Sequence, residues 1–362
     1  MRVLLLRANP RKTGYAQRLG DLFLQGVRET DAIVKDVDLT ELSMERCLGC
    51  YHCWLTTPGQ CVHSDDMGPL LKEVLAADVV VCLTPLYFYS MSAALKIFFE
   101  RTLPLTRQGF VPSAGGGTRN STRYPDRWQG KRLISIVTGA LRDPSIYQPL
   151  NDTFRLLADG LDLDLAGQLT RPESYLLDYP LSKPRTLKKI RVAFVQAGRE
   201  TGTAGRLSRE TMENASLPLS VDCDHFRTYS NIYWARAVEM GEAGLVPFEV
   251  QKNVAADVRI LMREMIRSLD PVATARVKAT LQFEFPDQKL AYQLRIDLGQ
   301  CKLTEGQAEN PDLRIRCNSE VWAALFTRQL DIRKALAERT LVLEGDKSLF
   351  SRLDRFFPPP SS

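Results

Sequence analysis

The stretch Ala77–Thr84, with the sequence ADVVVCLT, is apolar at nearly every position and continues into the aromatic stretch Pro85–Ser92, PLYFYSMS. Near-continuous apolar content is typical of a strand that is covered on both faces of a parallel sheet. In the following stretch, Ala93–Arg101, apolar residues recur at helical spacing. The sequence therefore predicts a buried strand, an aromatic loop and a helix in succession.

The same succession is expected at the start of the chain. Arg2–Ala8 is a short apolar run, Asn9–Tyr15 is polar and contains a glycine, and Ala16–Arg28 is apolar at helical spacing. Strands that alternate with helices predict an α/β fold with a doubly wound parallel sheet, in which ligands bind beyond the carboxyl ends of the strands. The loops that we expect on that edge begin near Asn9, Cys47, Pro85 and Gly139.

Four of the eight cysteines lie within fifteen residues, at Cys47, Cys50, Cys53 and Cys61. Gly49 eases the tight turn that would bring these thiols together. Four thiolates are the ligand set of iron–sulfur clusters and of structural zinc. Three interpretations remain open at this point: a [4Fe–4S] cluster, structural zinc, or thiols that bind no metal and are structural or redox-active.

Composition indicates a globular protein of two domains. Of the 362 residues 44% are hydrophobic and 25% are charged, and this length is too great for one ordinary core. The net charge of +5 is spread along the chain, so we expect no nucleic-acid partner.

No apolar run approaches the roughly 18–20 residues of a membrane span, and the amino terminus lacks a signal-peptide pattern. We therefore expect a cytoplasmic protein, in which thiols stay reduced.

Two further observations limit the chemistry. Gln108–Gln129 is rich in Gly, Ser, Pro and Arg, and we expect a flexible loop there. The chain has only three histidines, which argues against a histidine-based hydrolase, and it has no P-loop and no nucleophile elbow. His52 could donate a hydrogen bond to a cluster on the cysteines or could simply lie on the surface, and the sequence identifies no catalytic side chain.

The hydrophobic pattern changes after Pro247. A helix is expected within Asn253–Arg267, followed by runs of alternating polar and apolar residues such as Thr280–Phe285 and Leu290–Leu298. Such alternation is typical of antiparallel strands with one face covered. Short helices and one more strand follow, so residues 246–362 are predicted to form a separate α+β domain after a first domain of residues 1–245.

Three motifs in the first domain resemble those of the NAD(P)H-dependent FMN reductase family of flavodoxin-like proteins, and within it the iron–sulfur flavoproteins. They are Ala8–Gly14 (ANPRKTG), Thr84–Ser92 with Lys96 and Arg101, and the run of four cysteines. The resemblance covers about residues 1–245, with the middle third only loosely matched. It implies a flavodoxin-like fold and an FMN-dependent oxidoreductase.

The resemblance also implies a set of cofactor-binding residues. The FMN phosphate would be held by the first loop, and the isoalloxazine ring by the aromatic loop. The family usually has Ser or Thr where this chain has Ala16, so we expect fewer phosphate contacts. The implied FMN-binding residues are Asn9, Arg11, Thr13, Gly14, Tyr15, Pro85, Leu86, Tyr87, Phe88, Tyr89, Ser90, Met91 and Gly139. The implied ligands of a [4Fe–4S] cluster are Cys47, Cys50, Cys53 and Cys61. The alternative for the aromatic loop is an apolar sheet edge that binds no ligand.

The second domain resembles the sterol carrier protein 2 fold, which holds an apolar ligand between its sheet and its helices. The matching stretches are Leu281–Phe285, Asn310–Ile315, Ser319–Trp322 and Leu341–Asp346 with Leu353–Phe357. The residues expected along such a tunnel are Phe283, Phe285, Trp322, Leu325, Phe326 and Phe350. The alternative is that these six side chains simply fill a core.

We therefore expect an FMN-dependent oxidoreductase that acts on a small redox substrate and is joined to a domain for an apolar or lipid ligand. NAD(P)H or a ferredoxin would supply electrons, and relatives of this kind suggest a homodimer. The alternatives are a cluster-free NAD(P)H:quinone reductase and a non-catalytic electron carrier or lipid-binding scaffold.

Overall fold

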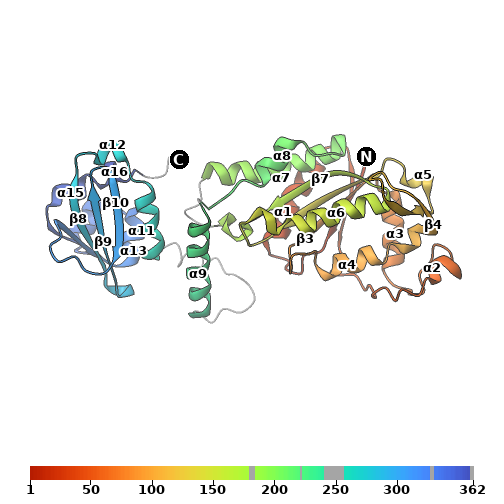
Figure 1. The fold of residues 1–362 in the computed structure, drawn as a ribbon, viewed down its shortest axis with the longest axis horizontal. Coiled ribbons are helices and arrows are strands. Elements are labelled where there is room, and N and C mark those ends of the chain that lie inside the picture. Colours follow the sequence, from red (N-terminus) through yellow and green to blue (C-terminus); the bar gives the residue numbers. More distant parts are fainter. Residues whose placement is uncertain (179–183, 221, 240–256, 327–329, 359–362) are drawn as a thin grey trace. The chain divides into compact units, whose positions relative to one another are not determined.

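The structure is a computed structural model that describes residues 1–178, 184–220, 222–239, 257–326 and 330–358. The described residues form two compact units (Figure 1). The first unit comprises Met1–Leu177 and Pro184–Ser220, and the second lies within Val221–Ser362. The predicted domain boundary at residue 245 lies outside the described residues. In the part of the chain that is described, no helix is long and apolar enough to cross a membrane.

The first unit is built on a five-stranded sheet whose neighbouring strands are all parallel. The strand order is β2-β1-β3-β6-β7, which is the order of flavodoxin-like sheets. The predicted fold class of this unit is therefore confirmed. The strands are β1 (Arg2–Arg7), β2 (Ile33–Asp38), β3 (Val79–Pro85), β6 (Arg132–Thr138) and β7 (Asp164–Arg171).

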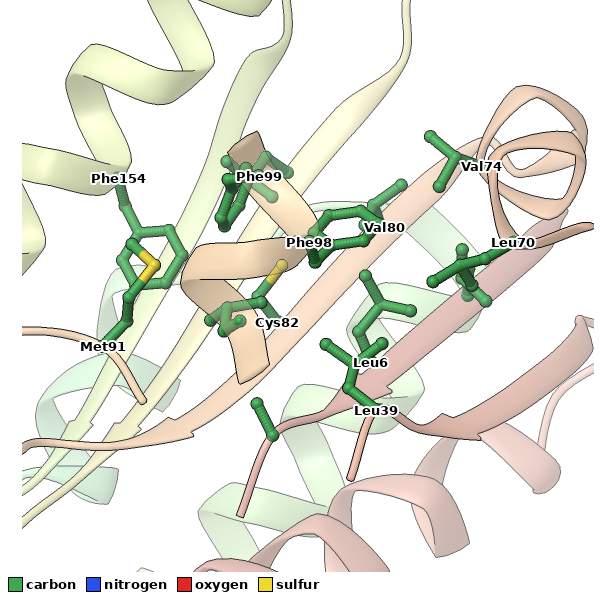
Figure 2. Close-up of a cluster of buried hydrophobic side chains, with 14 of the residues drawn as sticks. Leu6, Leu39, Leu70, Val74, Val80, Cys82, Met91, Phe98, Phe99 and Phe154 are labelled. Carbon is green, nitrogen blue, oxygen red and sulfur yellow. The ribbon is translucent and has the colours of Figure 1, made fainter. Parts of the chain in front are cut away.

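Helices cover the sheet of the first unit because its strands are apolar on both faces. The helices of this unit are α1 (Tyr15–Arg28), α2 (His52–Leu55), α3 (Met67–Ala76), α4 (Ala93–Glu100), α5 (Pro125–Trp128), α6 (Gln148–Leu161), α7 (Pro184–Ala204) and α8 (Arg209–Ala215). Leu6 and Val80 of the strands pack against α3, α4 and α6 in one buried cluster (Figure 2). Val3 and Leu5 point to the opposite face and are equally buried.

Helices α1 and α7 approach each other at two glycines. A Cβ atom on Gly26 would lie 1.8 Å from the carbonyl oxygen of Val195, and a Cβ atom on Gly198 would lie 2.0 Å from that of Phe23. Backbone therefore lies directly against backbone at this crossing. Only residues without a side chain allow such close packing.

The segment predicted to be a flexible loop is instead a β-hairpin, so that prediction was wrong. Strands β4 (Thr106–Pro112) and β5 (Thr118–Thr122) pair antiparallel. The N–H of Gly115 at the turn donates to Asp159 of α6 at 2.8 Å, and Arg119 pairs with Asp162 at 2.8 Å. These contacts with α6 and with the residue that follows it order a stretch whose composition alone suggests no regular structure.

The second unit has a mixed sheet in the order β10-β9-β8-β11-β12, in which only β8 and β11 are parallel. The predicted α+β class is confirmed. The strands are β8 (Lys278–Phe285), β9 (Leu290–Asp297), β10 (Gln300–Glu305), β11 (Leu313–Cys317) and β12 (Leu341–Gly345). The helices are α9 (Cys223–Glu239), α11 (Val258–Arg267), α12 (Pro271–Thr274), α13 (Ser319–Phe326), α14 (Ile332–Ala337), α15 (Lys347–Ser351) and α16 (Leu353–Phe356).

The six residues expected along an apolar tunnel belong to one hydrophobic cluster of the second unit. Phe283, Phe285 and Trp322 are buried, and the ring centroid of Trp322 lies 5.2 Å from that of Phe283 and 6.3 Å from that of Phe285. Leu325, Phe326 and Phe350 are partly buried at the margin of the same cluster. The structure thus brings all six together beneath the sheet.

Substitution at the glycine crossing should destabilise the first unit. We expect Gly26→Ala to lower the free energy of unfolding by about 2–3 kcal/mol, because the added methyl group forces the two backbones apart. Urea denaturation followed by circular dichroism measures this change. The matched control is Gly160→Ala in α6, where a Cβ atom would meet nothing within 4 Å. That variant should be stabilised by about 0.5–1 kcal/mol, and equal effects of the two changes would contradict the role of the crossing.

Candidate functional site

Three of the predicted loops meet at the carboxyl edge of the parallel sheet. The N–H of Ala8 donates to the carbonyl of Leu83 at 2.9 Å, and the N–H of Leu86 donates to the carbonyl of Thr138 at 2.7 Å. The loops after β1, β3 and β6 are therefore neighbours. The strand order reverses beside β1, and this is where doubly wound sheets bind their ligands.

The first loop leads into helix α1 without a side-chain cap. Gly14 is the N-cap residue, and no side chain accepts a hydrogen bond from the first turn. Backbone N–H groups at a helix start carry a partial positive charge and bind anions readily. The loop predicted to hold a phosphate group therefore ends in donors that are available to one.

Asn9 is buried at the base of this loop and is only 2% exposed. Its side-chain N–H group donates to the carbonyl of Arg11 and to the side chain of Gln17, both at 3.1 Å. Its oxygen Oδ1 is buried and has no hydrogen-bond partner in the described part of the chain. A buried acceptor left unpaired costs about 1–3 kcal/mol, so this atom indicates a place for a hydrogen-bond donor of a bound molecule.

The two basic residues of the first loop differ in their availability. Lys12 lies 2.5 Å from Asp38 and also pairs with Glu41. The hydrogen bond to Asp38 raises the pKa of Lys12. Arg11 is exposed, and among the described residues no carboxylate is paired with it. Arg11 is therefore the better placed of the two cations for an anionic ligand.

The aromatic loop after β3 forms a tight turn. Tyr87 and Ser90 exchange two backbone hydrogen bonds of 2.9 Å. Phe88 and Tyr89, between them, have φ values of 45° and 63°, in the left-handed region, where residues with side chains lose about 1–2 kcal/mol each. Phe88 is 99% exposed and Tyr89 is 60% exposed. This strained turn thus presents two aromatic rings beside the first loop, as strained backbone at ligand sites often does.

Other predicted residues of the aromatic loop face inward. Met91 is buried and lies beside Phe154 in the apolar cluster under the loop (Figure 2). Leu86 is partly buried against the same cluster. Ser92, which the sequence analysis did not select, begins α4, and its buried Oγ has no partner among the described residues. Nothing in the sequence distinguishes Ser92 from an ordinary helix start.

Gly139 follows β6 at the same edge, but the space left by its missing side chain is filled by another residue of the chain. A Cβ atom there would lie 2.4 Å from the hydroxyl oxygen of Tyr147. Tyr147 is buried, and its hydroxyl donates to the carbonyl of Leu141 at 2.6 Å. Burial raises the pKa of Tyr147. Gly139 therefore makes room for a neighbouring ring of its own chain.

The four clustered cysteines line one small pocket that is partly open to solvent. Gly49 has a φ value of +63°, as its predicted role in a tight turn requires. Cys53 is the buried member of the set. Burial first, and then the proximity of Cys61, raise the pKa of Cys53.

The thiols share a pocket without being gathered around one point. Among the described residues, no group of three or more His, Cys, Asp or Glu side chains is arranged to hold a metal ion. Zinc needs four ligands within about 2.0–2.3 Å of one ion, so the arrangement does not fit a structural zinc site. An iron–sulfur cluster binds thiolates at several irons, and four thiols around one pocket suit that chemistry better.

A buried ion pair closes the ends of the cysteine segment. Arg101 is 1% exposed and forms two hydrogen bonds with Asp65, at 2.8 and 2.9 Å. Arg101 also donates to the carbonyl of Glu45 at 2.5 Å, and Asp65 accepts from the N–H of Glu45 at 2.9 Å. Residues 45 and 65 are thereby held together on the end of α4.

The cysteine pocket does not share an edge with the other three loops. Glu100 and Arg101, which line it, end helix α4, whereas the aromatic loop leads into the start of that helix. Eight helical residues span about 12 Å. Figure 1 shows α2, which carries Cys53, beyond the end of α4. The loop after β2 begins at the shared edge, where the N–H of Leu39 donates to the carbonyl of Arg7, and then continues to Ser43, whose N–H donates to Asp66.

The pocket also contains a histidine that the sequence analysis did not select. His63 lines it together with the cysteines, whereas His52 begins α2 and is not among the lining residues. The Nε2 atom of His63 is buried and has no hydrogen-bond partner among the described residues. A single histidine two positions after a cysteine gives no pattern from which this position could be predicted.

Comparison with known families agrees with both resemblances. Residues 1–145 match the NADPH-dependent FMN reductase family, and residues 262–358 match the SCP-2 sterol transfer family. The chain thus joins a domain of the first family to a domain of the second.

Individual relatives match the first unit only in part. An iron-sulfur flavoprotein of Archaeoglobus fulgidus is 29% identical over 118 residues, which are 33% of this chain and 53% of that protein. An iron-sulfur flavoprotein of Methanocaldococcus jannaschii is 31% identical over 110 residues, 30% of this chain and 55% of that protein. An FMN-dependent NADH:quinone oxidoreductase of Nocardia farcinica is 43% identical over 73 residues, 19% and 34% of the two chains. The chain spans about half the length of the first two relatives.

Removing the counter-charge of Arg101 should destabilise the first unit. We expect Asp65→Asn to lower the free energy of unfolding by about 3–5 kcal/mol, because it leaves a buried guanidinium group unpaired. Urea denaturation provides the measurement. Asp126→Asn on α5 is the control, since Asp126 is exposed and its loss should change stability by less than about 0.5 kcal/mol.

The same pair should make stability depend on pH. Burial alone would raise the pKa of Asp65, but hydrogen bonds from Arg101 and from the N–H of Glu45 hold it below its usual value. The unfolded chain therefore binds this proton more readily. The stabilisation is complete above a pH of about 4 and is lost as the pH falls through the pKa of the folded protein. The wild type and Asp65→Asn should thus converge in stability in acid, and a constant difference would refute the assignment.

Relief of the strained turn should stabilise the protein. We expect Tyr89→Gly to raise the free energy of unfolding by about 1 kcal/mol, because glycine adopts positive φ without a steric penalty. Tyr87→Gly, at a neighbouring position whose φ is not positive, should instead be neutral or destabilising. Thermal unfolding of both variants distinguishes the two cases, and a destabilised Tyr89→Gly variant would show that the turn is not strained.

Proposed function

We propose that the first unit is an FMN-dependent oxidoreductase. Three features meet at the point where the strand order reverses, and they carry this proposal. They are the uncapped start of α1, the unpaired oxygen of Asn9 and the exposed aromatic turn. A flavin mononucleotide has a phosphate group that the helix start could bind, hydroxyl groups that could donate to the Asn9 oxygen, and a flat aromatic ring that could lie against the turn. The matched family is described as an FMN reductase, in agreement with this reading.

The residues at this edge would bind and orient the cofactor. Arg11, Thr13 and Gly14 would hold the phosphate group, with Arg11 supplying the positive charge, and Oδ1 of Asn9 would accept a hydrogen bond from a hydroxyl group of the cofactor. Tyr87, Phe88 and Tyr89 would lie against the ring. FMN supplies hydride and electron transfer when bound, so the chain needs no acid–base side chain of its own for that step.

We propose a reduced nicotinamide as the electron donor, in keeping with the NADPH-dependent family that residues 1–145 match. The cysteine pocket would hold a [4Fe–4S] cluster through Cys47, Cys50, Cys53 and Cys61, which supplies one-electron transfer when bound. Two observations support the proposed cluster: four thiols line one pocket, and two of the relatives are iron-sulfur flavoproteins. A ferredoxin is the alternative donor.

A cluster-free NAD(P)H:quinone reductase is the second candidate. The Nocardia farcinica relative, an FMN-dependent NADH:quinone oxidoreductase, favours it. A non-catalytic electron carrier is the third candidate. These candidates differ in iron content and in whether a nicotinamide reduces the flavin directly.

For the second unit we propose binding of an apolar ligand between sheet and helices. The SCP-2 family match and the gathering of six apolar side chains in one cluster support this proposal. The alternative is a filled core without a ligand. An apolar redox substrate held in this unit would connect the two halves of the chain functionally.

Spectroscopy of the purified chain tests the function. A flavoprotein should absorb near ~370 and ~450 nm, and a cluster should add a broad shoulder that dithionite bleaches. NADPH alone should bleach the flavin bands if the chain is a reductase. Bleaching that requires an added ferredoxin would favour the carrier, and a protein that binds no FMN would overturn the proposal.

The two cations of the first loop should contribute unequally to FMN affinity. We expect Arg11→Ala to raise the Kd for FMN about tenfold, because a charged hydrogen bond to phosphate is worth about 1.5 kcal/mol or more. Lys12→Ala is the matched control and should change Kd less than about twofold, since Lys12 is engaged by Asp38 and Glu41. Quenching of FMN fluorescence measures both values. Equal losses would contradict the assignment.

A further inference from the structure

The cysteine pocket contains two buried nitrogen atoms that have no hydrogen-bond partner in the described part of the chain. They are Nε2 of His63 and Nε of Arg101. Each unpaired buried polar atom costs about 1–3 kcal/mol. Nε of Arg101 is a donor, and Nε2 of His63 is a donor in the tautomer that carries the proton there, so an acceptor in this pocket would satisfy both atoms.

Few groups of the pocket could act as that acceptor. The lining is otherwise Leu48, Tyr51, Val62, Leu103 and Pro104, with Glu100 and the four cysteines. Glu100 is the one carboxylate among these lining residues, and it is paired with Lys96. Besides the hydroxyl group of Tyr51 and the carboxylate of Glu100, the sulfur atoms of the four cysteines are the side-chain acceptors of this lining. Neutral thiols accept hydrogen bonds weakly, whereas thiolates and sulfides bound to iron carry negative charge and accept them well.

We propose that His63 donates a hydrogen bond from Nε2 to a sulfur atom of an iron–sulfur cluster held by the four cysteines, and that this bond raises the reduction potential of the cluster. The inference rests on the cluster of the proposed function. A cluster gains negative charge when it is reduced, and an N–H donor stabilises the reduced form more than the oxidised form. Hydrogen bonds to the sulfurs are among the factors that set such potentials.

His63 is the donor that can be tested without loss of the fold. Arg101 holds the ends of the cysteine segment together through Asp65 and Glu45, so its replacement would move the cysteines themselves. His63 has no such contact among the hydrogen bonds of the described residues. The competing role for His63 is that of an iron ligand in place of the exposed Cys50.

The test uses the full chain, loaded with iron and sulfide without oxygen. His63→Phe removes the donor and keeps a ring, and His63→Asn removes the donor from the Nε2 position and keeps polarity. His63→Gln restores an N–H group at that position. His52→Phe is the matched control, because His52 is on the same segment but not among the residues that line the pocket. Iron per chain and the midpoint potential, from a dye-mediated titration followed by electron paramagnetic resonance at one pH, are the readouts.

We expect the wild type and all four variants to hold equal iron. The equilibrium for reduction should become about tenfold less favourable in His63→Phe and in His63→Asn, which is a fall of about 59 mV for a one-electron couple. His63→Gln and His52→Phe should keep the wild-type potential.

Three results would overturn the inference. An unchanged potential in both His63→Phe and His63→Asn would show that Nε2 makes no bond to the cluster. Loss of iron in these two variants, with iron retained in His52→Phe, would make His63 a ligand. A wild-type chain that takes up no iron would remove the cluster itself, and with it this part of the proposed function, while leaving FMN binding to be judged by its own spectrum.

Discussion

The ion pair between Arg101 and Asp65 determines where the cysteine segment lies. Both side chains are buried, and separating two charges from water is costly unless further hydrogen bonds compensate. Here the carbonyl and the N–H of Glu45 supply these hydrogen bonds. Arg101, Asp65 and Glu45 therefore hold the two ends of the cysteine segment, residues 45 and 65, against each other and against the end of α4. The position of the thiols, the shape of their pocket and the distance of that pocket from the aromatic turn all depend on this closure.

Much of the first unit could be predicted from its hydrophobic pattern. The apolar runs at Arg2–Ala8 and Ala77–Thr84 become β1 and β3 because a parallel sheet must be covered on both faces. The loops that follow them are neighbours because parallel strands end at one edge. The hairpin of β4 and β5 could not be predicted, since Asp159 of α6 and Asp162 directly after it, which hold the hairpin, are distant in sequence. The same limit applies to the cysteine pocket: spacing shows that thiols can converge, but not at which end of a helix.

In the candidate site, too, the sequence predicts which residues lie in a loop but not which contacts they make with residues distant in the sequence. Arg11 and Lys12 are equivalent in the sequence, yet the structure engages one with Asp38 and Glu41 and leaves the other exposed. Gly139 looks like a point of close approach for a ligand, and its space is taken by Tyr147. In the second unit the alternation of β8 and β9 predicts the buried face, which the structure confirms, but alternation cannot say whether a face covers a ligand or only other side chains.

The turn at Phe88 and Tyr89 has a kinetic consequence. Its two backbone hydrogen bonds hold the backbone of both residues in place while their rings face solvent. A flat ligand that arrives there does not wait for a loop to fold and does not bear the entropy of ordering one. The strain energy is carried by the free protein instead, as part of its folding equilibrium. The association rate constant of a ligand at this edge should accordingly approach that of binding to a rigid, preformed site. Differences in affinity between ligands should then appear mainly in their dissociation rate constants.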